Sequence, residues 1–331
     1  MMKLSLMKEV VVNSVNSDWD CELAGILLQD WDHDPGWIKF WRASANFVCF
    51  FKNKDRDYII RFNRDTERSP EDINEEIKLI LYLDSKGIKT AKPVLSCRGR
   101  YVETRETPYG RFISAVFEKI PGEHPEITEM KESDFRKWGQ SMGRIHNAVK
   151  TMPGTLPIKR KTHREIFQDL IELNPPRDLP EKQETEWIIA QLDSLDRREE
   201  NFGLIHYDFE TDNIIDCEGD FYAIDFDDAI YSWYAADIAY ALRDLFNDGP
   251  RFNLSDQRFR YFMEGYQDLT TIDAGQIENI PFFYRFHNYI SYKKLQRAMD
   301  LEKKKENPEW MNDLIDKLQD FRSGYSRNFY N

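Results

Sequence analysis

The sequence predicts an α+β protein whose strands and helices are segregated along the chain. Residues 37–120 contain short runs rich in β-branched and aromatic residues, whereas residues 135–321 mostly carry apolar residues at helical spacing. One strand-turn-strand segment, residues 214–224, interrupts the helices. This order fits an α+β chain and not an alternating βαβ chain. With 331 residues, 41% of them hydrophobic, the chain can form one large domain or two ordinary ones.

The first strands form a predicted hairpin. Residues 47–51 and 58–62 are short apolar and aromatic runs, and residues 52–57 between them are polar turn formers. A helix is expected next, with Ser69 as its N-cap, Pro70 at its first position and Gly87 after its end.

Further strands are expected at residues 93–96, 101–103 and 112–120, before Pro121 and Gly122 break the chain. We take this break as the boundary between a region of residues 1–120 and a region of residues 121–331. The second region is mainly helical, with helices expected at residues 135–148, 165–173, 181–195, 234–246, 257–269, 282–299 and 310–321.

The charge of the chain argues against two classes of partner. A formal net charge of −13 repels nucleic-acid phosphates and anionic lipid headgroups, so binding to either would need a local basic patch. The densest basic run, Lys303–Lys305, is bracketed by Glu302 and Glu306 and is expected to be a solvated helix face. We therefore expect no nucleic-acid and no membrane partner.

The four cysteines lie far apart and form no C-x-x-C pair, so neither a disulfide framework nor a zinc site is expected. No apolar segment approaches the length of a membrane span, and the N-terminal apolar stretch is broken by Lys8 and Glu9. These features predict a soluble protein in the cytoplasm.

The most informative residues lie in two adjacent segments, 203–215 and 222–228. The first contains H-x-D-x-x-x-x-N, with His206, Asp208 and Asn213, and the second contains D-F-D, with Asp225 and Asp227. Apolar runs before each segment are expected to bring both polar clusters to one end of a small sheet. Asp and Asn are common turn formers, and a lone H-x-D would fit an ordinary polar loop. The complete, correctly ordered run favours a functional site.

This pattern fits phosphoryl transfer. Asp208 would accept the proton of an acceptor hydroxyl, and His206 would brace the loop through hydrogen bonds. Asn213 and Asp225 offer the hard oxygen ligands that Mg²⁺ prefers, and Asp227 is a further candidate ligand.

The motif, the chain length and the order of the two regions resemble the aminoglycoside phosphotransferase and choline kinase-like superfamily, over roughly residues 35–300. Within it, the chain looks most like bacterial homoserine kinase type II and stress-response kinase-like proteins. The resemblance implies a bilobal protein kinase-like fold, with a small antiparallel-sheet N-lobe that binds nucleotide and a mainly helical C-lobe that binds the acceptor. It also implies ATP and Mg²⁺ as cofactors.

The resemblance assigns two nucleotide-contacting segments in the N-terminal lobe. Ser44 and Asn46 lie where the phosphate-binding loop belongs, although the glycine-rich pattern is absent. Backbone groups around Glu118 and Ile120 lie where the family's hinge binds adenine. Taken alone, the first segment would read as a β-turn and the second as a strand that ends at a turn.

Arg61 falls where a kinase places its phosphate-binding lysine, and Glu76 falls where its ion-pair partner belongs. Arginine keeps the positive charge and adds a planar fork of donors suited to phosphate. Glu75 is a rival partner, but Glu76 lies nearer the inward helical face. Without the resemblance, a surface ion pair would be the ordinary interpretation.

Two departures from the protein-kinase pattern point to a small acceptor. Tyr207 replaces the arginine of H-R-D, which removes the residue that would dock an activation-loop phosphate. Asp227 replaces the glycine of D-F-G, and only residues 228–231 precede the next helix-like segment, so no long activation loop is present. Small hydroxylated metabolites are therefore the expected acceptors.

The acceptor is expected to carry an amine, because acids and aromatic residues that follow the hairpin would suit a cation. They are Asp227, Asp228, Tyr231, Trp233, Tyr234, Asp237, Tyr284, His287 and Tyr289. Aromatic residues at this spacing are also typical of a core, and Asp237 is an alternative anchor for the catalytic loop.

Other functions stay open at this point: a non-catalytic kinase-fold binding or assembly protein, a Ser/Thr protein kinase of the stress-response type, and a metal-dependent hydrolase. The acceptor's identity and the oligomeric state do not follow from the sequence.

Overall fold

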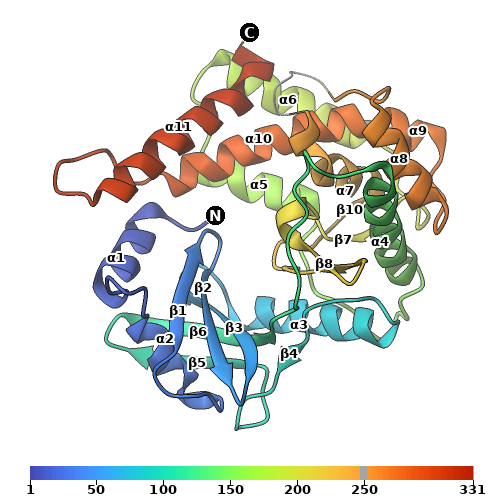
Figure 1. Cartoon of the computed structure of the whole chain (residues 1–331). Coiled ribbons are helices and arrows are strands. Elements are labelled where there is room, and N and C mark those ends of the chain that lie inside the picture. The colour runs from blue at the N-terminus through green and yellow to red at the C-terminus, as the bar shows by residue number, and fades with distance from the viewer. Residues whose placement is uncertain (247–251, 331) are drawn as a thin grey trace. The chain divides into compact units, whose positions relative to one another are not determined.

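The computed structural model describes residues 1–246 and 252–330 and divides into two compact units (Figure 1). Unit 1 comprises residues 1–85, 90–121 and 298–315. Unit 2 comprises residues 86–89, 122–297 and 316 onward.

Unit 1 is built on an antiparallel sheet with the strand order β1-β2-β3-β6-β4, in which β5 also pairs with β6. Helices α1 and α2 precede the sheet in the chain, and α3 follows β3. The elements are α1 (Leu4–Ser14), α2 (Glu22–Leu27), the 3₁₀ helix η1 (Leu28–Asp30), β1 (Ile38–Ala43), β2 (Phe47–Asn53), β3 (Arg56–Arg64), α3 (Pro70–Ser85), β4 (Pro93–Val94), β5 (Val102–Thr107) and β6 (Gly110–Glu118).

The predicted hairpin and helix of unit 1 are confirmed. Strands β2 and β3 are antiparallel and are joined by Lys54 and Asp55, both with positive φ (49° and 64°), as a tight two-residue turn requires. Helix α3 begins after Ser69, whose Oγ accepts the backbone N–H of Asp72 at 3.1 Å. Gly87, with φ of 75°, follows its end.

Unit 2 is mainly helical. Its elements are α4 (Glu132–Lys150), α5 (His163–Leu173), α6 (Leu179–Ser194), β7 (Phe202–Ile205), η2 (Thr211–Asn213), β8 (Ile214–Cys217), β9 (Asp220–Ala223), β10 (Ile230–Trp233), α7 (Tyr234–Ala241), η3 (Arg243–Leu245), α8 (Gln257–Gln267), α9 (Ala274–Glu278), α10 (Ile280–Ala298) and most of α11 (Glu309–Tyr330). All seven helices expected after residue 121 are present, with shifted ends; residues 234–246 form α7 and η3. The segregated α+β order is confirmed.

The strands of unit 2 form two small sheets, not the single sheet that was predicted. Strands β8 and β9 form the expected hairpin, which turns at Glu218 and Gly219. Strand β7 pairs instead with β10, with Ile205 opposite Ile230. The prediction was wrong because β10 lies directly after the motif and was not recognised as a strand.

Helices α4 and α8 pack closely because glycine lies at their contact (Figure 1). A Cβ atom at Gly139 would lie 1.9 Å from the carbonyl oxygen of Phe262, and one at Gly265 would lie 2.0 Å from that of Arg136. The two backbones can therefore approach only without these side chains.

The predicted helix at Lys303–Lys305 is wrong. These residues are exposed, as expected, but they lie in the connection between α10 and α11. The side chain of Asn312 accepts a hydrogen bond from the N–H of Lys304 and donates one to its carbonyl oxygen, and these bonds stabilise a turn.

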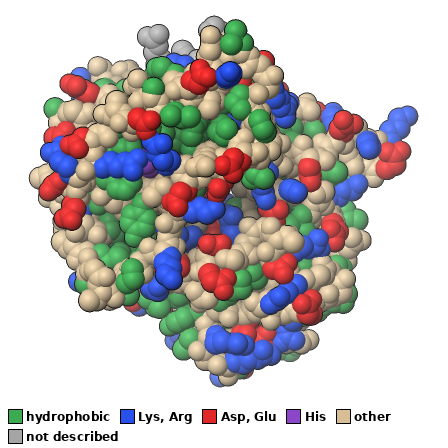
Figure 2. All heavy atoms as spheres, turned by 180° about the vertical axis from the view of Figure 1, so that it is seen from behind, with side chains coloured by type: hydrophobic (Ala, Val, Ile, Leu, Met, Phe, Trp, Pro, Cys, Tyr) green, Lys and Arg blue, Asp and Glu red, His purple; other side chains and the backbone are tan. Residues whose placement is uncertain are grey.

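Acidic and basic side chains are interspersed over the molecular face in Figure 2. Within the described ranges, no helix has the length and apolar character needed to cross a bilayer. All four cysteines are free.

Candidate active site

The loop that follows β7 is anchored by one buried carboxylate. Asp237, on α7, accepts the backbone N–H of His206 at 3.0 Å and that of Tyr207 at 2.8 Å. Tyr207 has a φ of 72°, a conformation that costs a non-glycine residue about 1 kcal/mol. The two hydrogen bonds to Asp237 hold the backbone in this conformation, so the alternative assignment of Asp237 as a loop anchor agrees with its contacts.

Asp237 is itself held by α4 and α8. The Nε2 of His146 lies 2.9 Å from Oδ2 of Asp237, and the Nδ1 lies 2.8 Å from the hydroxyl of Tyr266. Burial lowers the pKa of His146, although Asp237 acts in the opposite direction. A neutral imidazole that donates to Asp237 and accepts from Tyr266 fits this geometry. His146 is thus a buried structural residue.

His206 connects the loop to the β8–β9 hairpin. Its Nδ1 accepts the N–H of Asp208 at 3.3 Å, which leaves Nε2–H to donate to the carbonyl of Ile224 at 3.0 Å. The N–H of Ile224 in turn donates to the carbonyl of Asn213 at 3.0 Å. These bonds bring the H-x-D segment, Asn213 and the residue before Asp225 together.

Asp208 lies between Asn213 and an arginine. The amide nitrogen of Asn213 donates to the carbonyl oxygen of Asp208 at 2.7 Å and to its Oδ2 at 3.0 Å. The guanidinium of Arg243 lies 3.0 Å from Oδ1 of the same carboxylate. About a third of the Asp208 side chain, 34%, is exposed, so its carboxylate can reach a small molecule in solution.

Arg243, at the start of η3, was missed by the sequence analysis. It pairs with Glu210 as well as with Asp208, and only 12% of its side chain is exposed. Burial raises the pKa of Glu210 to about 8 against the pull of Arg243, and Asp208 and Asp244 act in the same direction as burial. One guanidinium thus faces three carboxyl groups. The available signal was a cation placed directly after the apolar residues 238–242.

The oxygen donors fit a magnesium ion held jointly with a nucleotide. Because the amide nitrogen of Asn213 is committed to Asp208, its amide oxygen is left as a donor. Asp225 follows β9 with a φ of 60°, and Asp227 is buried. Within residues 1–246 and 252–330, no three His, Cys, Asp or Glu side chains form a metal-binding cluster of their own. Mg²⁺ suits this set, because it commonly takes one or two protein ligands and completes its shell with phosphates and water.

In unit 1, Arg61 and Glu76 form the expected ion pair. Glu76 is fully buried and 10% of the Arg61 side chain is exposed, whereas Glu75 pairs with Lys78 at 2.6 Å. The guanidinium also lies over the ring of Phe117, 5.0 Å from its centre. These contacts fix the planar fork of Arg61 in place.

The other two predicted nucleotide-contacting segments differ in which of their polar groups are left to bind a ligand. Asn46 is buried and its side-chain oxygen accepts a hydrogen bond from Asn63, while Ser44 is exposed in the turn between β1 and β2. The N–H of Glu118 donates to the carbonyl of Lys92. The N–H of Ile120 makes no backbone hydrogen bond within the described residues. Ser44 and Ile120 are therefore better placed than Asn46 and Glu118 to bind a ligand through these groups.

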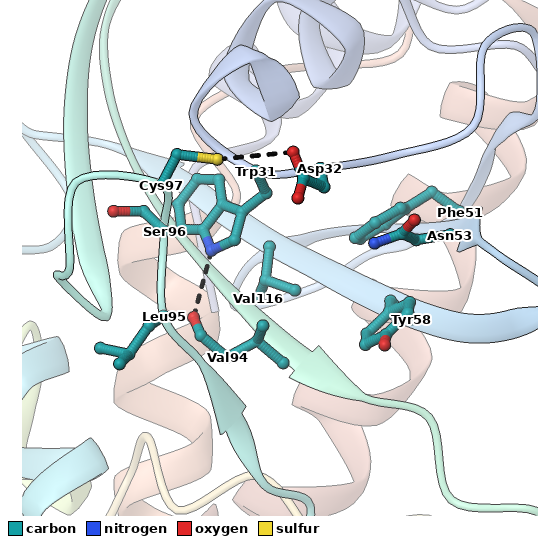
Figure 3. Close-up of a pocket in the computed structure, with 10 residues that line it drawn as sticks. All are labelled: Trp31, Asp32, Phe51, Asn53, Tyr58, Val94, Leu95, Ser96, Cys97 and Val116. Atoms are coloured by element: carbon teal, nitrogen blue, oxygen red, sulfur yellow. Dashed lines mark hydrogen bonds between the residues drawn. The ribbon is translucent and has the colours of Figure 1, made fainter.

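Unit 1 contains a cavity of about 220 Å³, whose lining residues are drawn in Figure 3. Tyr58 and Val116 line it, and the strand register places both on the face that Arg61 does not share. Trp31 closes one side and donates a hydrogen bond to the carbonyl of Val94. This cavity is separate from the Arg61–Glu76 pair.

The expected cation-binding wall is only partly supported. Trp233, Tyr234, Tyr284 and Tyr289 are 1–3% exposed and belong to the core. Among the acids of that wall, Asp228 pairs with Lys294 at 2.8 Å. The charge of Asp228 is thus already matched by Lys294.

Comparison with known proteins identifies the family. The model of the phosphotransferase enzyme family matches residues 37–270. The chain is 27% identical over 274 residues to the amicoumacin kinase of Bacillus subtilis (strain 168), which covers 80% of this chain and 81% of that protein. The chain therefore belongs to the phosphotransferase enzyme family, and it is an enzyme that transfers a phosphoryl group to an alcohol group.

Solved structures agree with this assignment. The amicoumacin kinase hAmiN in complex with AMP-PNP, Ca²⁺ and Ami has a TM-score of 0.75 at 25% identity, covering 92% of each chain. A microcompartment-associated aminopropanol kinase has a TM-score of 0.72 at 16% identity, covering 92% of this chain and 94% of that one. A spectinomycin phosphotransferase has a TM-score of 0.62 at 13% identity, covering 93% and 97%. The bilobal protein kinase-like fold and the predicted superfamily are confirmed.

Proposed function

We propose that this protein is an ATP-dependent kinase that moves the γ-phosphoryl group of ATP to a hydroxyl group of a small, amine-bearing molecule. The observation that carries the proposal is the arrangement around Asp208. Its carboxylate is partly exposed and is oriented by Asn213 and Arg243. The loop of Asp208 is linked through His206 to the segment that begins with Asp225. A loose phosphoryl-transfer transition state asks for positioning and charge stabilisation, and such a fixed set of residues supplies both.

Each unit contributes one part of the proposed reaction. In unit 1, which we propose as the nucleotide-binding lobe, Arg61 contacts the phosphates of ATP while Glu76 holds its guanidinium, and the N–H of Ile120 binds the adenine. Ser44 is the proposed contact of the β1–β2 turn. In unit 2, the proposed catalytic lobe, Asp208 orients the acceptor hydroxyl and receives its proton.

The proposed metal ligands are Asn213 and Asp225, with Asp227 as a further candidate. ATP and Mg²⁺ are the cofactor pair, in keeping with the AMP-PNP and Ca²⁺ of the hAmiN structure. When bound, Mg²⁺ supplies charge neutralisation on the phosphates.

The proposed class of acceptor rests on the charge around Arg243 and on the names of related kinases. Even while Glu210 holds a proton, the carboxylates of Asp208 and Asp244 outnumber the single guanidinium of Arg243, so a cationic amine would be attracted to this part of unit 2. Of the relatives, amicoumacin kinase is named for amicoumacin, and aminopropanol kinase is named for an amine-bearing alcohol. An amicoumacin-like compound or an amino alcohol is therefore the first acceptor to test.

The test is ATP consumption by the purified protein with a panel of acceptors: amicoumacin, amino alcohols, homoserine, an aminoglycoside and a generic protein substrate. We expect Mg²⁺-dependent consumption with at least one amine-bearing alcohol and none with the protein substrate. ATP binding without consumption for any acceptor would favour the non-catalytic assembly protein instead.

A further inference from the structure

Helix α10 presents a histidine and a lysine to the same part of unit 2. His287 and Lys294 are seven residues apart, two helical turns, so they lie on the same face. The ring of His287 lies 4.6 Å from that of Tyr240 and 6.1 Å from that of Tyr207. This face of α10 therefore packs against the catalytic loop and α7.

Lys294 contacts two functional segments at once. Its Nζ lies 2.8 Å from Oδ2 of Asp228 and 5.0 Å from the ring centre of Tyr207. Tyr207 directly precedes Asp208, and Asp228 lies three residues after Asp225. One ammonium group thus joins the loop of the proposed base to the segment of a proposed metal ligand.

Lys294 is positively charged at its site. Burial opposes its positive charge, but Asp228, Tyr207 and Asp208 together outweigh burial and raise the pKa of Lys294 above its ordinary value. Burial, together with Arg243 and Lys294, lowers the pKa of His287, which stays neutral. The contact with Tyr207 is a cation–π contact with a charged ammonium group.

We propose that Lys294 is a positioning residue for phosphoryl transfer, which keeps the loop of Asp208 in register with the segment of Asp225. The proposal rests on the function proposed above for these two residues. The hydrogen bonds of Ile224 to His206 and to Asn213 join the same two segments on the N-terminal side of Asp225. The bridge from Asp228 through Lys294 to Tyr207 adds an attachment on the C-terminal side of Asp225, so the segment is held on both sides of the proposed ligand.

The bridge also fixes Tyr207, whose backbone is strained. Its hydroxyl has no hydrogen-bond partner within the described part of the chain, so the ring is held by packing and by the cation alone. Because Tyr207 and Asp208 are adjacent, a shift of this ring changes the direction of the Asp208 carboxylate. A misplacement of about 1 Å can cost about 100-fold in rate.

The experiment compares Lys294→Met, Lys294→Arg, Asp228→Asn and the double variant Lys294→Met/Asp228→Asn. We expect Lys294→Met to lower kcat about 10- to 100-fold with little change in the KM for ATP, and Lys294→Arg to recover most of kcat because the charge is kept. The double variant should be no slower than Lys294→Met, since both substitutions break one bridge. The affinity for a non-hydrolysable ATP analogue should stay near the wild-type value.

The matched control is Lys161→Met, which breaks the exposed ion pair with Asp169 in the same unit and should leave kcat unchanged. The side chains of Lys294 and Asp228 are 27% and 32% exposed, so these variants should fold, and thermal unfolding checks this. An active wild type with an equally active Lys294→Met variant would overturn the positioning role alone. The positioning role would also be overturned if the fall in kcat of Lys294→Met were proportional to a fall in the fraction of folded protein and Lys294→Arg did not recover kcat. A wild type that phosphorylates no acceptor would remove the proposed function itself.

Discussion

Arg61 in unit 1 and Arg243 in unit 2, two arginines with little exposed side chain, differ in the charge that surrounds them. Arg61 faces the carboxylate of Glu76, and together they form a matched pair. Arg243 contacts Asp208 and Glu210, with Asp244 as a third carboxyl group nearby. The first arrangement fixes a cation in place, whereas the second retains an excess of negative charge beside the proposed base. This difference supports the proposed roles, which are phosphate binding at Arg61 and attraction of a cationic acceptor near Arg243.

The largest effect is expected from Asp208→Asn, which removes the proposed base from the acid-rich site. We expect kcat to fall about 10²- to 10⁴-fold, because the amide cannot accept the hydroxyl proton. Binding of Mg·ATP, measured by calorimetry, should be nearly unchanged. The control is Asp212→Asn, an exposed carboxylate in the same loop. Equal turnover in Asp208→Asn and the wild type would exclude Asp208 as the base.

The next effect concerns the matched pair of unit 1. The double variant Arg61→Met/Glu76→Gln removes both charges and should raise the KM for ATP about 10- to 100-fold, since a charged hydrogen bond to phosphate is lost. The KM for the acceptor should change little. The single variant Arg61→Met would instead leave Glu76 buried and unpaired, which costs about 3–5 kcal/mol of stability. An unaltered KM for ATP in the double variant would speak against a phosphate role.

A smaller effect is expected from Arg243→Gln. Without the guanidinium, the Asp208 carboxylate keeps only its bond to Asn213, so we expect kcat to fall about 10-fold with little effect on ATP affinity. The matched control is Arg258→Gln, which breaks the partly exposed pair with Asp256 at the start of α8. If both variants behaved alike, Arg243 would have no special role in positioning the base.

The smallest effect is a pH dependence of stability. The pKa of Glu210 is raised from 4.5 to about 8, so between these values the folded protein holds a proton that the unfolded chain has lost. The free energy of unfolding should therefore fall as the pH rises through this range. Glu210→Gln should flatten this decline in urea titrations at several pH values, while the exposed Glu199→Gln should not. A decline that is identical in Glu210→Gln would show that Glu210 does not titrate in this way.

What the sequence could predict was mainly local. The β2–β3 hairpin and the cap at Ser69 follow from neighbouring residues, and the partner of Arg61 followed from the helical face of Glu76. These features could be predicted because they depend on the spacing of nearby residues and on a recognisable order of motifs.

The missed features depend on long-range packing. Arg243 and Lys294 reach the catalytic loop from segments 35 and 86 residues beyond Asp208, and no spacing rule connects them to it. The pairing of β7 with β10 likewise required a partner chosen by the tertiary fold. The orientation of Asn46 toward Asn63 is set by the sheet and not by its own turn.

The proposed activity of this protein is phosphorylation of a hydroxyl group of a small amine-bearing molecule. The most direct measurement is the mass of each candidate acceptor after incubation with the wild-type protein, ATP and Mg²⁺. We expect one amine-bearing alcohol to gain the mass of a single phosphoryl group, on a hydroxyl oxygen, and only when Mg²⁺ is present. If every acceptor is recovered unchanged although the protein binds ATP, the claim is contradicted.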